Sequence, residues 1–156
     1  MAGFVHPVRR ATAEEMPAVG RMLHDFNLEF EDATPGPEAL ATRVRELQER
    51  RNFVVLLAGT GPDGLVILRF RPSIWTEGLE CYIAELYVRP ARRRQGLGRA
   101  LMLEAMTVAR AKGADYMDLG TSEDDVAARA LYESLGFSNR ERLPDGPVMY
   151  VYEREL

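Results

Sequence analysis

Cysteine, histidine and long apolar runs are all scarce in this 156-residue chain. Cys81 is the only cysteine, which excludes a disulfide framework and a cysteine-based zinc site. The two histidines, His6 and His24, are too isolated to predict a metal site. No apolar run reaches the ~18 residues of a transmembrane helix, and Met1 to Arg10 lacks the apolar stretch of a signal peptide. These absences predict a soluble, cytoplasmic protein that does not bind membranes.

The chain also has no excess of positive charge, because it contains 20 Lys and Arg and 24 Asp and Glu, which give a formal net charge of -4. A general nucleic-acid binder needs a basic face to neutralise phosphates, so we expect no nucleic-acid partner. What is present is an ordinary globular share of hydrophobic residues, 46%, which is enough to bury a sizeable core. With this length, and without linkers or repeats, the chain predicts a single domain over residues 1–156.

Hydrophobic periodicity and turn residues predict an alternation of strands and helices. Strands are expected at residues 4–10, 53–58, 65–70, 80–88, 116–120, 137–142 and 148–154, and helices from Thr12, at 38–50, from Gly96 to about Lys112, and at 126–135. The hairpin signal Asp63-Gly64 predicts antiparallel pairing in the middle of the chain. The strand–helix–strand run from Glu80 to Gly120 predicts a parallel pair. Together these elements predict a mixed sheet with helices on its faces, an α/β (α+β) fold.

The junction from Tyr87 to Leu101 carries the strongest chemical signal in the chain. A strand stops at Pro90, three arginines follow at positions 92–94, and Gly96 and Gly98 open a helix with an apolar stripe. The first N–H groups of a helix have no partner inside it and attract anions, and glycine lets a phosphate approach the backbone. The junction therefore predicts a phosphate site. A tight turn with a solvated basic patch is the alternative interpretation.

Two motifs resemble those of the GNAT superfamily of N-acetyltransferases. Arg93-x-x-Gly96-x-Gly98 is similar to the acyl-CoA pyrophosphate loop of that family, and Ala128-x-x-Leu131-Tyr132-x-x-x-Gly136-Phe137 is similar to its second motif, in the expected order. The resemblance covers nearly the whole chain from Val8. It implies a mixed, mostly antiparallel sheet of six to seven strands flanked by about four helices. It also implies an acetyl-CoA-dependent N-acetyltransferase without a metal, which moves the acetyl group directly from the thioester to a primary amine of a small molecule.

The same resemblance implies which residues contact acetyl-CoA. They are Leu86, Tyr87, Val88, Arg93, Arg94, Gln95, Gly96, Leu97, Gly98, Arg99, Ala100, Ala128 and Tyr132. Asp125 departs from the pattern, because many members of the family have an asparagine there whose amide contacts the pantetheine arm. An aspartate keeps the acceptor and loses the donors. We therefore expect Asp125 to cap the following helix, and main-chain groups near Thr121 to hold the arm.

Acyl transfer to an amine needs a base, a donor for the oxyanion and a proton for the departing thiolate. On the pattern of the family, Tyr132 is expected to supply that proton and the N–H of Val88 to stabilise the oxyanion. Glu85 is the best candidate for the base, with Glu80 acting through a water as the second choice. A surface carboxylate or ion-pair partner is the alternative for Glu85. Cys81 lacks a His-Asp or His-Asn partner pattern, so we expect a strand cysteine and no acyl-enzyme.

The acceptor pocket is less constrained by the sequence. Three acidic residues lie at the end of the first predicted helix, where members of the family often build that pocket: Glu29, Glu31 and Asp32. With Trp75, Tyr82 and Glu85 they could line a pocket for a cationic amine. A solvated acidic helix end is the alternative for Glu29. Acetylation of a protein amine, and a CoA-binding or regulatory module without catalysis, stand as alternative functions, and a phosphate or nucleic-acid binder is a weaker one. A homodimer is also compatible with the sequence.

Overall fold

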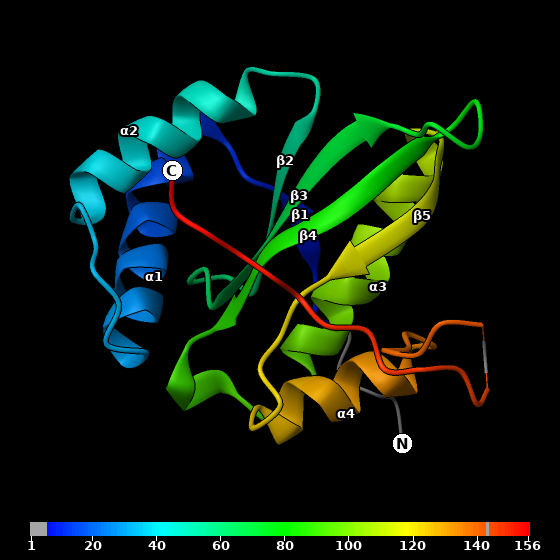
Figure 1. Cartoon of the computed structure of the whole chain (residues 1–156). Coiled ribbons are helices and arrows are strands. Elements are labelled where there is room, and N and C mark those ends of the chain that lie inside the picture. Colours follow the sequence, from blue (N-terminus) through cyan, green and yellow to red (C-terminus); the bar gives the residue numbers. More distant parts are fainter. Residues whose placement is uncertain (1–5, 143) are drawn as a thin grey trace. The chain divides into compact units, whose positions relative to one another are not determined.

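The sheet is the element on which the site is built, and its strands all lie in the first 119 residues (Figure 1). The computed structural model describes residues 6–142 and 144–156. The chain divides into two compact units, Met1–Leu119 and Gly120–Leu156. Our expectation of a single domain over residues 1–156 stays a prediction.

Five strands pair in chain order to form this mixed sheet. They are β1 (Val8–Arg10), β2 (Phe53–Ala58), β3 (Gly64–Pro72), β4 (Leu79–Val88) and β5 (Ala114–Leu119). The first three pairings are antiparallel, and β4 pairs with β5 in parallel through the helix that connects them. The prediction of a mostly antiparallel mixed sheet is therefore confirmed. The predicted strand at 4–10 begins only at Val8, and residues 4 and 5 lie outside the described residues.

Four α-helices accompany the sheet, as predicted. They are α1 (Met16–Glu29), α2 (Pro37–Gln48), α3 (Leu97–Ala111) and α4 (Val126–Ser134), with short 3₁₀ turns at Ala13–Glu15 and Pro90–Arg92. The Glu15 carboxylate accepts the Thr12 N–H at 3.2 Å, which satisfies a backbone donor at the start of the first helical segment. Gly113, with a φ of 92°, follows the end of α3, as its position in the sequence predicts.

The two faces of the sheet in the first unit are covered by different helices (Figure 1). Val55, Leu57, Leu65 and Ile67 pack in one buried cluster with residues of α1 and α2. On the other face, α3 buries an apolar stripe of Leu97, Leu101, Met102, Ala105 and Ala109. Every residue of β2 is buried, because this strand lies in the middle of the sheet with helices on both faces.

The prediction of six to seven strands is wrong, since the described residues form a five-stranded sheet. The missing strands are those expected at 137–142 and 148–154, which meet only at one antiparallel bridge, Arg140 to Val148. The Glu141 N–H donates to the Pro147 carbonyl at 3.0 Å, but proline has no N–H with which to return that bond. Pro147 therefore limits the pairing on the turn side of the bridge. On the other side the Met149 N–H donates to the Asn139 carbonyl at 2.7 Å, but the residues that follow are exposed and form no strand.

Gly20→Ala is expected to destabilise the first unit although alanine favours helices. A Cβ at position 20 would lie 2.2 Å from the Pro37 carbonyl oxygen and 2.8 Å from the Ala41 nitrogen, both on α2. Overpacking of this kind costs about 1–3 kcal/mol, which is more than the ~1 kcal/mol gained in helix propensity. Urea unfolding should show a lower free energy of unfolding for Gly20→Ala and little change for the exposed neighbour Arg21→Ala. An unchanged value for Gly20→Ala would contradict this close packing of α1 on α2.

Candidate active site

The carboxyl half of β4 is unpaired on the side that faces β5. The parallel pairing of β4 with β5 ends at Ile83 and Leu119, so residues 84–88 have no β5 partner. The register with β3 also shifts between Ile67 and Leu68, which leaves Ala84 as an extra residue, a β-bulge. Within the described residues, the backbone groups of this stretch that point away from β3 thus have no strand partner, and the Val88 carbonyl among them accepts instead from Arg93 Nε at 2.9 Å.

The N–H of Val88 belongs to this unpaired edge. The next residue, Arg89, donates its N–H to the Asp63 carbonyl at 2.9 Å, toward β3. Successive N–H groups of a strand point in opposite directions, so the N–H of Val88 points away from β3. This orientation is the one that the predicted oxyanion donor requires, and the role itself stays a prediction.

The glycine turn after β4 exposes the N-terminus of α3. Gly96 has a φ of 87° and Arg94 a φ of 61°, both in the left-handed region that glycine adopts without strain. The first backbone bond of the helix is donated by Ala100 to the Gly96 carbonyl at 3.0 Å. The N–H groups of Leu97 and Gly98 precede this bond in the first turn, at the positive end of a 15-residue helix, where N–H groups attract anions.

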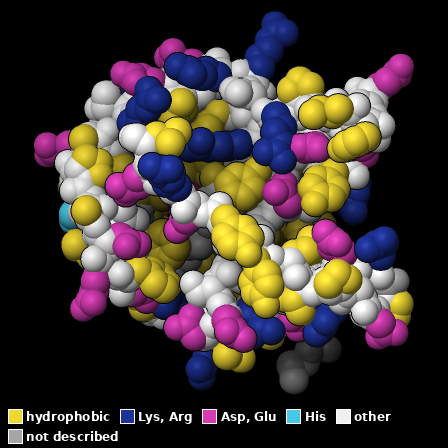
Figure 2. Space-filling view, viewed as in Figure 1, with side chains coloured by type: hydrophobic (Ala, Val, Ile, Leu, Met, Phe, Trp, Pro, Cys, Tyr) yellow, Lys and Arg dark blue, Asp and Glu magenta, His cyan; other side chains and the backbone are white. Residues whose placement is uncertain are grey.

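The three arginines of the turn have different surroundings. Arg92 lies 3.8 Å from the Asp63 carboxylate, and Arg94 is exposed. Arg93 donates from Nη1 and Nη2 to the two Glu29 oxygens at 2.6 Å each, and from Nε to the Val88 carbonyl at 2.9 Å. Two of the three basic side chains are thus matched by carboxylates, and Figure 2 shows basic and acidic side chains interspersed over the face that it presents.

Glu85 is a half-buried carboxylate in the unpaired stretch of β4. It lies opposite Ile67, a residue of the core cluster on the α1–α2 face of the sheet. Burial raises the pKa of Glu85 above its ordinary value of 4.5, and the charge of Arg69 opposes this shift. The second candidate for the base, Glu80, is instead held by Arg71, whose Nε donates to it at 2.5 Å. The geometry therefore favours Glu85 of the two.

The fold does not bring together the residues predicted to bind the acceptor, among them Glu29, Trp75 and Tyr82. Trp75 lies in the β3–β4 loop with 87% of its surface exposed, before the start of β4. Glu29 is bound to Arg93, which follows the end of β4. A ten-residue strand spans roughly 30 Å, so these two side chains mark opposite ends of it. Tyr82 lies between them and is 39% exposed.

Cys81 and Asp125 have the structural roles expected of them. Cys81 is fully buried, and burial raises the pKa of its thiol to about 12, so it is no nucleophile at neutral pH. In the second unit, the Asp125 carboxylate accepts the Ala128 N–H at 3.2 Å and caps α4. The buried strand cysteine and the cap of α4 are confirmed, while the absence of an acyl-enzyme and the main-chain contacts near Thr121 stay predictions.

Tyr132 lies on α4, two residues before the end of that helix. Its ring packs edge-on against Phe137, with centroids 6.1 Å apart. Burial, with a contribution from the Asp125 carboxylate, raises the pKa of Tyr132 to about 12. The phenol is therefore protonated over the whole range in which an enzyme of this kind would work, as a proton donor must be.

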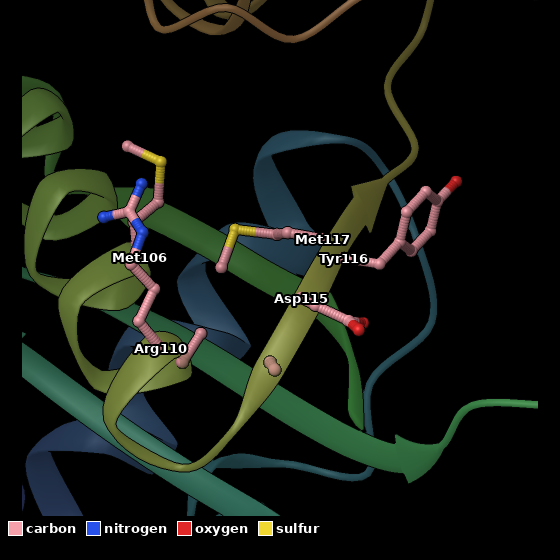
Figure 3. A pocket seen from close by; sticks show the side chains of 7 residues that line it. Met106, Arg110, Asp115, Tyr116 and Met117 are labelled. Carbon is pink, nitrogen blue, oxygen red and sulfur yellow. The ribbon is translucent and has the colours of Figure 1, made fainter. Parts of the chain in front are cut away.

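A separate, open hollow of about 230 Å³ lies between α3 and β5 (Figure 3). Met106 and Arg110 of α3 and Met117 of β5 line it, and Figure 3 shows Tyr116 pointing away from the helix. None of the residues predicted to bind acetyl-CoA or the acceptor lines this hollow. Among the described residues, no helix is long and apolar enough to cross a membrane, and no group of three or more His, Cys, Asp or Glu could hold a metal ion.

The sequence model of the acetyltransferase (GNAT) family matches residues 19–137. Among solved structures, a provisionally assigned acetyltransferase from Arthrobacter sp. FB24 is 42% identical, covers 100% of this chain and 99% of its own, and superposes with a TM-score of 0.88. Thialysine N-epsilon-acetyltransferase of Caenorhabditis elegans is 28% identical over 76% of this chain and 74% of its own length. Mycothiol acetyltransferase of Beutenbergia cavernae is 39% identical over 42% of this chain, and the match spans only 23% of that protein.

Proposed function

Because the chain belongs to the acetyltransferase (GNAT) family, we propose that it transfers an acetyl group from acetyl-CoA directly to a primary amine of a small molecule. Acetyltransferases of this family use acetyl-CoA as co-substrate. The observation that carries the proposal is the continuity of the unpaired edge of β4 with the glycine turn and the open N-terminus of α3. A ligand such as acetyl-CoA could place its extended pantetheine arm along the edge of β4 and its pyrophosphate at the glycine turn.

The pyrophosphate is assigned to the turn and the first residues of α3. The N–H groups of Leu97 and Gly98 lie in the first turn of α3, ahead of the first backbone bond of the helix, and the left-handed backbone at Gly96 lets a phosphate approach them. The exposed Arg94 adds positive charge at the rim. Gln95 and Ala100 flank these positions, while Leu86, Tyr87 and Val88 supply the edge for the pantetheine arm. Ala128 and Tyr132 are assigned to acetyl-CoA from the second motif of the family.

The reaction that we propose has three steps for residues of this chain. The Glu85 carboxylate removes a proton from the amine, directly or through a water, so that the nitrogen lone pair can attack the thioester carbonyl. The N–H of Val88 donates to the oxyanion that forms. When the carbon–sulfur bond breaks, Tyr132 gives a proton to the thiolate. The nitrogen then loses its second proton, which returns through solvent to the Tyr132 phenolate, and the products are an amide and a free thiol.

The pH profile should identify Glu85 as the base. A protonated carboxyl cannot accept the proton of the amine, so kcat/KM falls as the pH drops through the pKa of Glu85. Because burial raises that pKa, we expect the acid limb above the ordinary value of 4.5. Glu85→Gln should lower kcat by about 10²–10⁴ and abolish this limb, whereas Glu80→Gln should keep it. An unaltered limb in Glu85→Gln would assign the base to another group.

Release of free thiol from acetyl-CoA, measured with a panel of amines, tests the function. The panel contains spermidine, lysine, thialysine and an aminoglycoside, because the relative from Caenorhabditis elegans is named for thialysine and the others span small cationic amines. We expect amine-dependent release well above the hydrolysis seen without amine, and an acetylated amine in the product. Release only with a peptide or protein amine would favour the alternative of protein acetylation.

A homodimer and a cytoplasmic location stay predictions.

A further inference from the structure

The ion pair between Glu29 and Arg93 joins two elements that flank the proposed site. Glu29 is the last residue of α1, and Arg93 lies five residues after the end of β4. Both guanidinium Nη atoms donate to the Glu29 carboxylate at 2.6 Å, the bidentate geometry that makes an ion pair specific. Hydrogen bonding to Arg93 holds the pKa of Glu29 below its usual value, so the pair persists at neutral pH.

Further contacts of Arg93 fix it to the end of β4 itself. Its Nε donates to the Val88 carbonyl at 2.9 Å, and its guanidinium lies 5.8 Å from the centre of the Tyr87 ring. Tyr87 is buried and packs against Phe26 of α1, with ring centroids 5.3 Å apart. Arg93 thus contacts the carbonyl of the residue whose N–H is proposed to bind the oxyanion, and at the same time the last turn of α1.

The α1 side of β4 is also the side on which Glu85 lies. Glu85 and Tyr87 are two residues apart on the strand and so share one face. Glu85 lies opposite Ile67 and Tyr87 opposite Leu65, and both of these partners belong to the cluster under α1 and α2. The last turns of α1, which pack on Tyr87 through Phe26, therefore lie on the same face of β4 as Glu85.

We infer that Arg93 is a positioning residue for the acceptor side of the site, acting through Glu29 and the Val88 carbonyl, and not a ligand of the CoA pyrophosphate. The inference rests on the proposed function, because it concerns the amine that the enzyme acetylates. It gives Glu29 the same role, in place of direct binding of the amine. Loss of either side chain frees the end of α1 and weakens the capture of the amine, while the glycine turn continues to bind acetyl-CoA.

The test compares Glu29→Gln, Arg93→Gln and the double variant in two measurements. One is the Kd of acetyl-CoA by calorimetry, and the other is kcat and KM for the best amine of the panel. We expect each single variant to raise the KM of the amine about tenfold and to change the Kd of acetyl-CoA by less than about twofold. The double variant should be no worse than either single one, because both remove one interaction. Arg93→Lys keeps the positive charge but loses the bidentate guanidinium, so its KM for the amine should lie between those of the wild type and Arg93→Gln.

Two controls separate this role from general effects. Arg43→Gln removes an exposed ion pair with Glu46 within α2 and should alter neither measurement. Arg94→Gln removes a basic side chain from the same turn and should raise the Kd of acetyl-CoA. A rise of about tenfold in the Kd of acetyl-CoA for Arg93→Gln, without one for Glu29→Gln, would overturn the inference and make Arg93 a phosphate ligand. If no amine is acetylated by the wild type, the proposed function fails, but the comparison of Kd values still decides whether Arg93 binds the phosphates.

Discussion

Gly96→Glu abolishes the binding of acetyl-CoA while the chain stays folded: this is the largest effect that we expect of a single substitution. Gly96 has a φ of 87°, so any other residue there costs about 1–2 kcal/mol, and a carboxylate would lie where the pyrophosphate is proposed to bind. There is room for the side chain, since a Cβ would lie 3.7 Å from the nearest atom of His6. A negative charge at a helix N-terminus is itself favourable, which offsets part of the strain.

A thermal melt with and without acetyl-CoA measures this effect. At a ligand concentration of 100 times Kd, binding stabilises the folded state by ~2.7 kcal/mol, which for a chain of this length raises Tm by about 5–10 °C. We expect that rise in the wild type and in Thr60→Glu, which places the same charge in the exposed β2–β3 turn. Gly96→Glu should show none. An equal rise in Gly96→Glu would mean that acetyl-CoA binds elsewhere.

Tyr132→Phe is expected to remove most of the turnover and little of the binding. The variant keeps the ring that packs on Phe137 and deletes only the hydroxyl, which its pKa of about 12 keeps protonated. General-acid catalysis contributes about 10²–10⁴ in rate. A thiolate is already a good leaving group, with a conjugate acid of pKa ~8.5, so we expect a loss of kcat near the lower end, about a hundredfold.

The measurement is steady-state thiol release at saturating amine, together with the Kd of acetyl-CoA for the same preparation. Tyr152→Phe is the matched control, because Tyr152 lies in the same unit and is 91% exposed. Its kcat should equal that of the wild type. If Tyr132→Phe retains full kcat, the thiolate leaves without a proton from this residue, and the assignment from the second motif fails.

Local signals were sufficient to predict most of the fold. The apolar run at 53–58 is a strand over exactly the residues expected of it, and Asp63-Gly64 leads from the β2–β3 turn into β3. The apolar run and the turn signal each consist of residues adjacent in the sequence, so both can be recognised from the sequence alone. At the C-terminal hairpin, Pro147 explains the loss of pairing only on the turn side, since it cannot return the hydrogen bond that Glu141 donates. Strand propensity alone did not reveal that the ladder would end there.

Long-range pairings could not be predicted from the sequence. Glu29 and Arg93 are separated by 64 positions, and each alone looked like a ligand of a different substrate. The unpaired edge of β4 follows from where β5 ends, which no motif encodes. Trp75 was grouped with Glu29 in one acceptor pocket, yet its loop lies at the other end of β4 from Glu29. Side chains that meet only in the folded chain leave no signal of spacing or periodicity.

Calorimetric titration of the wild-type chain with acetyl-CoA tests the central claim most directly, with inorganic pyrophosphate titrated in parallel. The account predicts one site with micromolar affinity for acetyl-CoA, and much weaker binding of pyrophosphate, because the edge of β4 contributes to the first and not to the second. Equal affinity for the two ligands would reduce the site to an anion-binding turn. No binding of acetyl-CoA at millimolar concentration would contradict the assignment of the β4 edge and the glycine turn as its site.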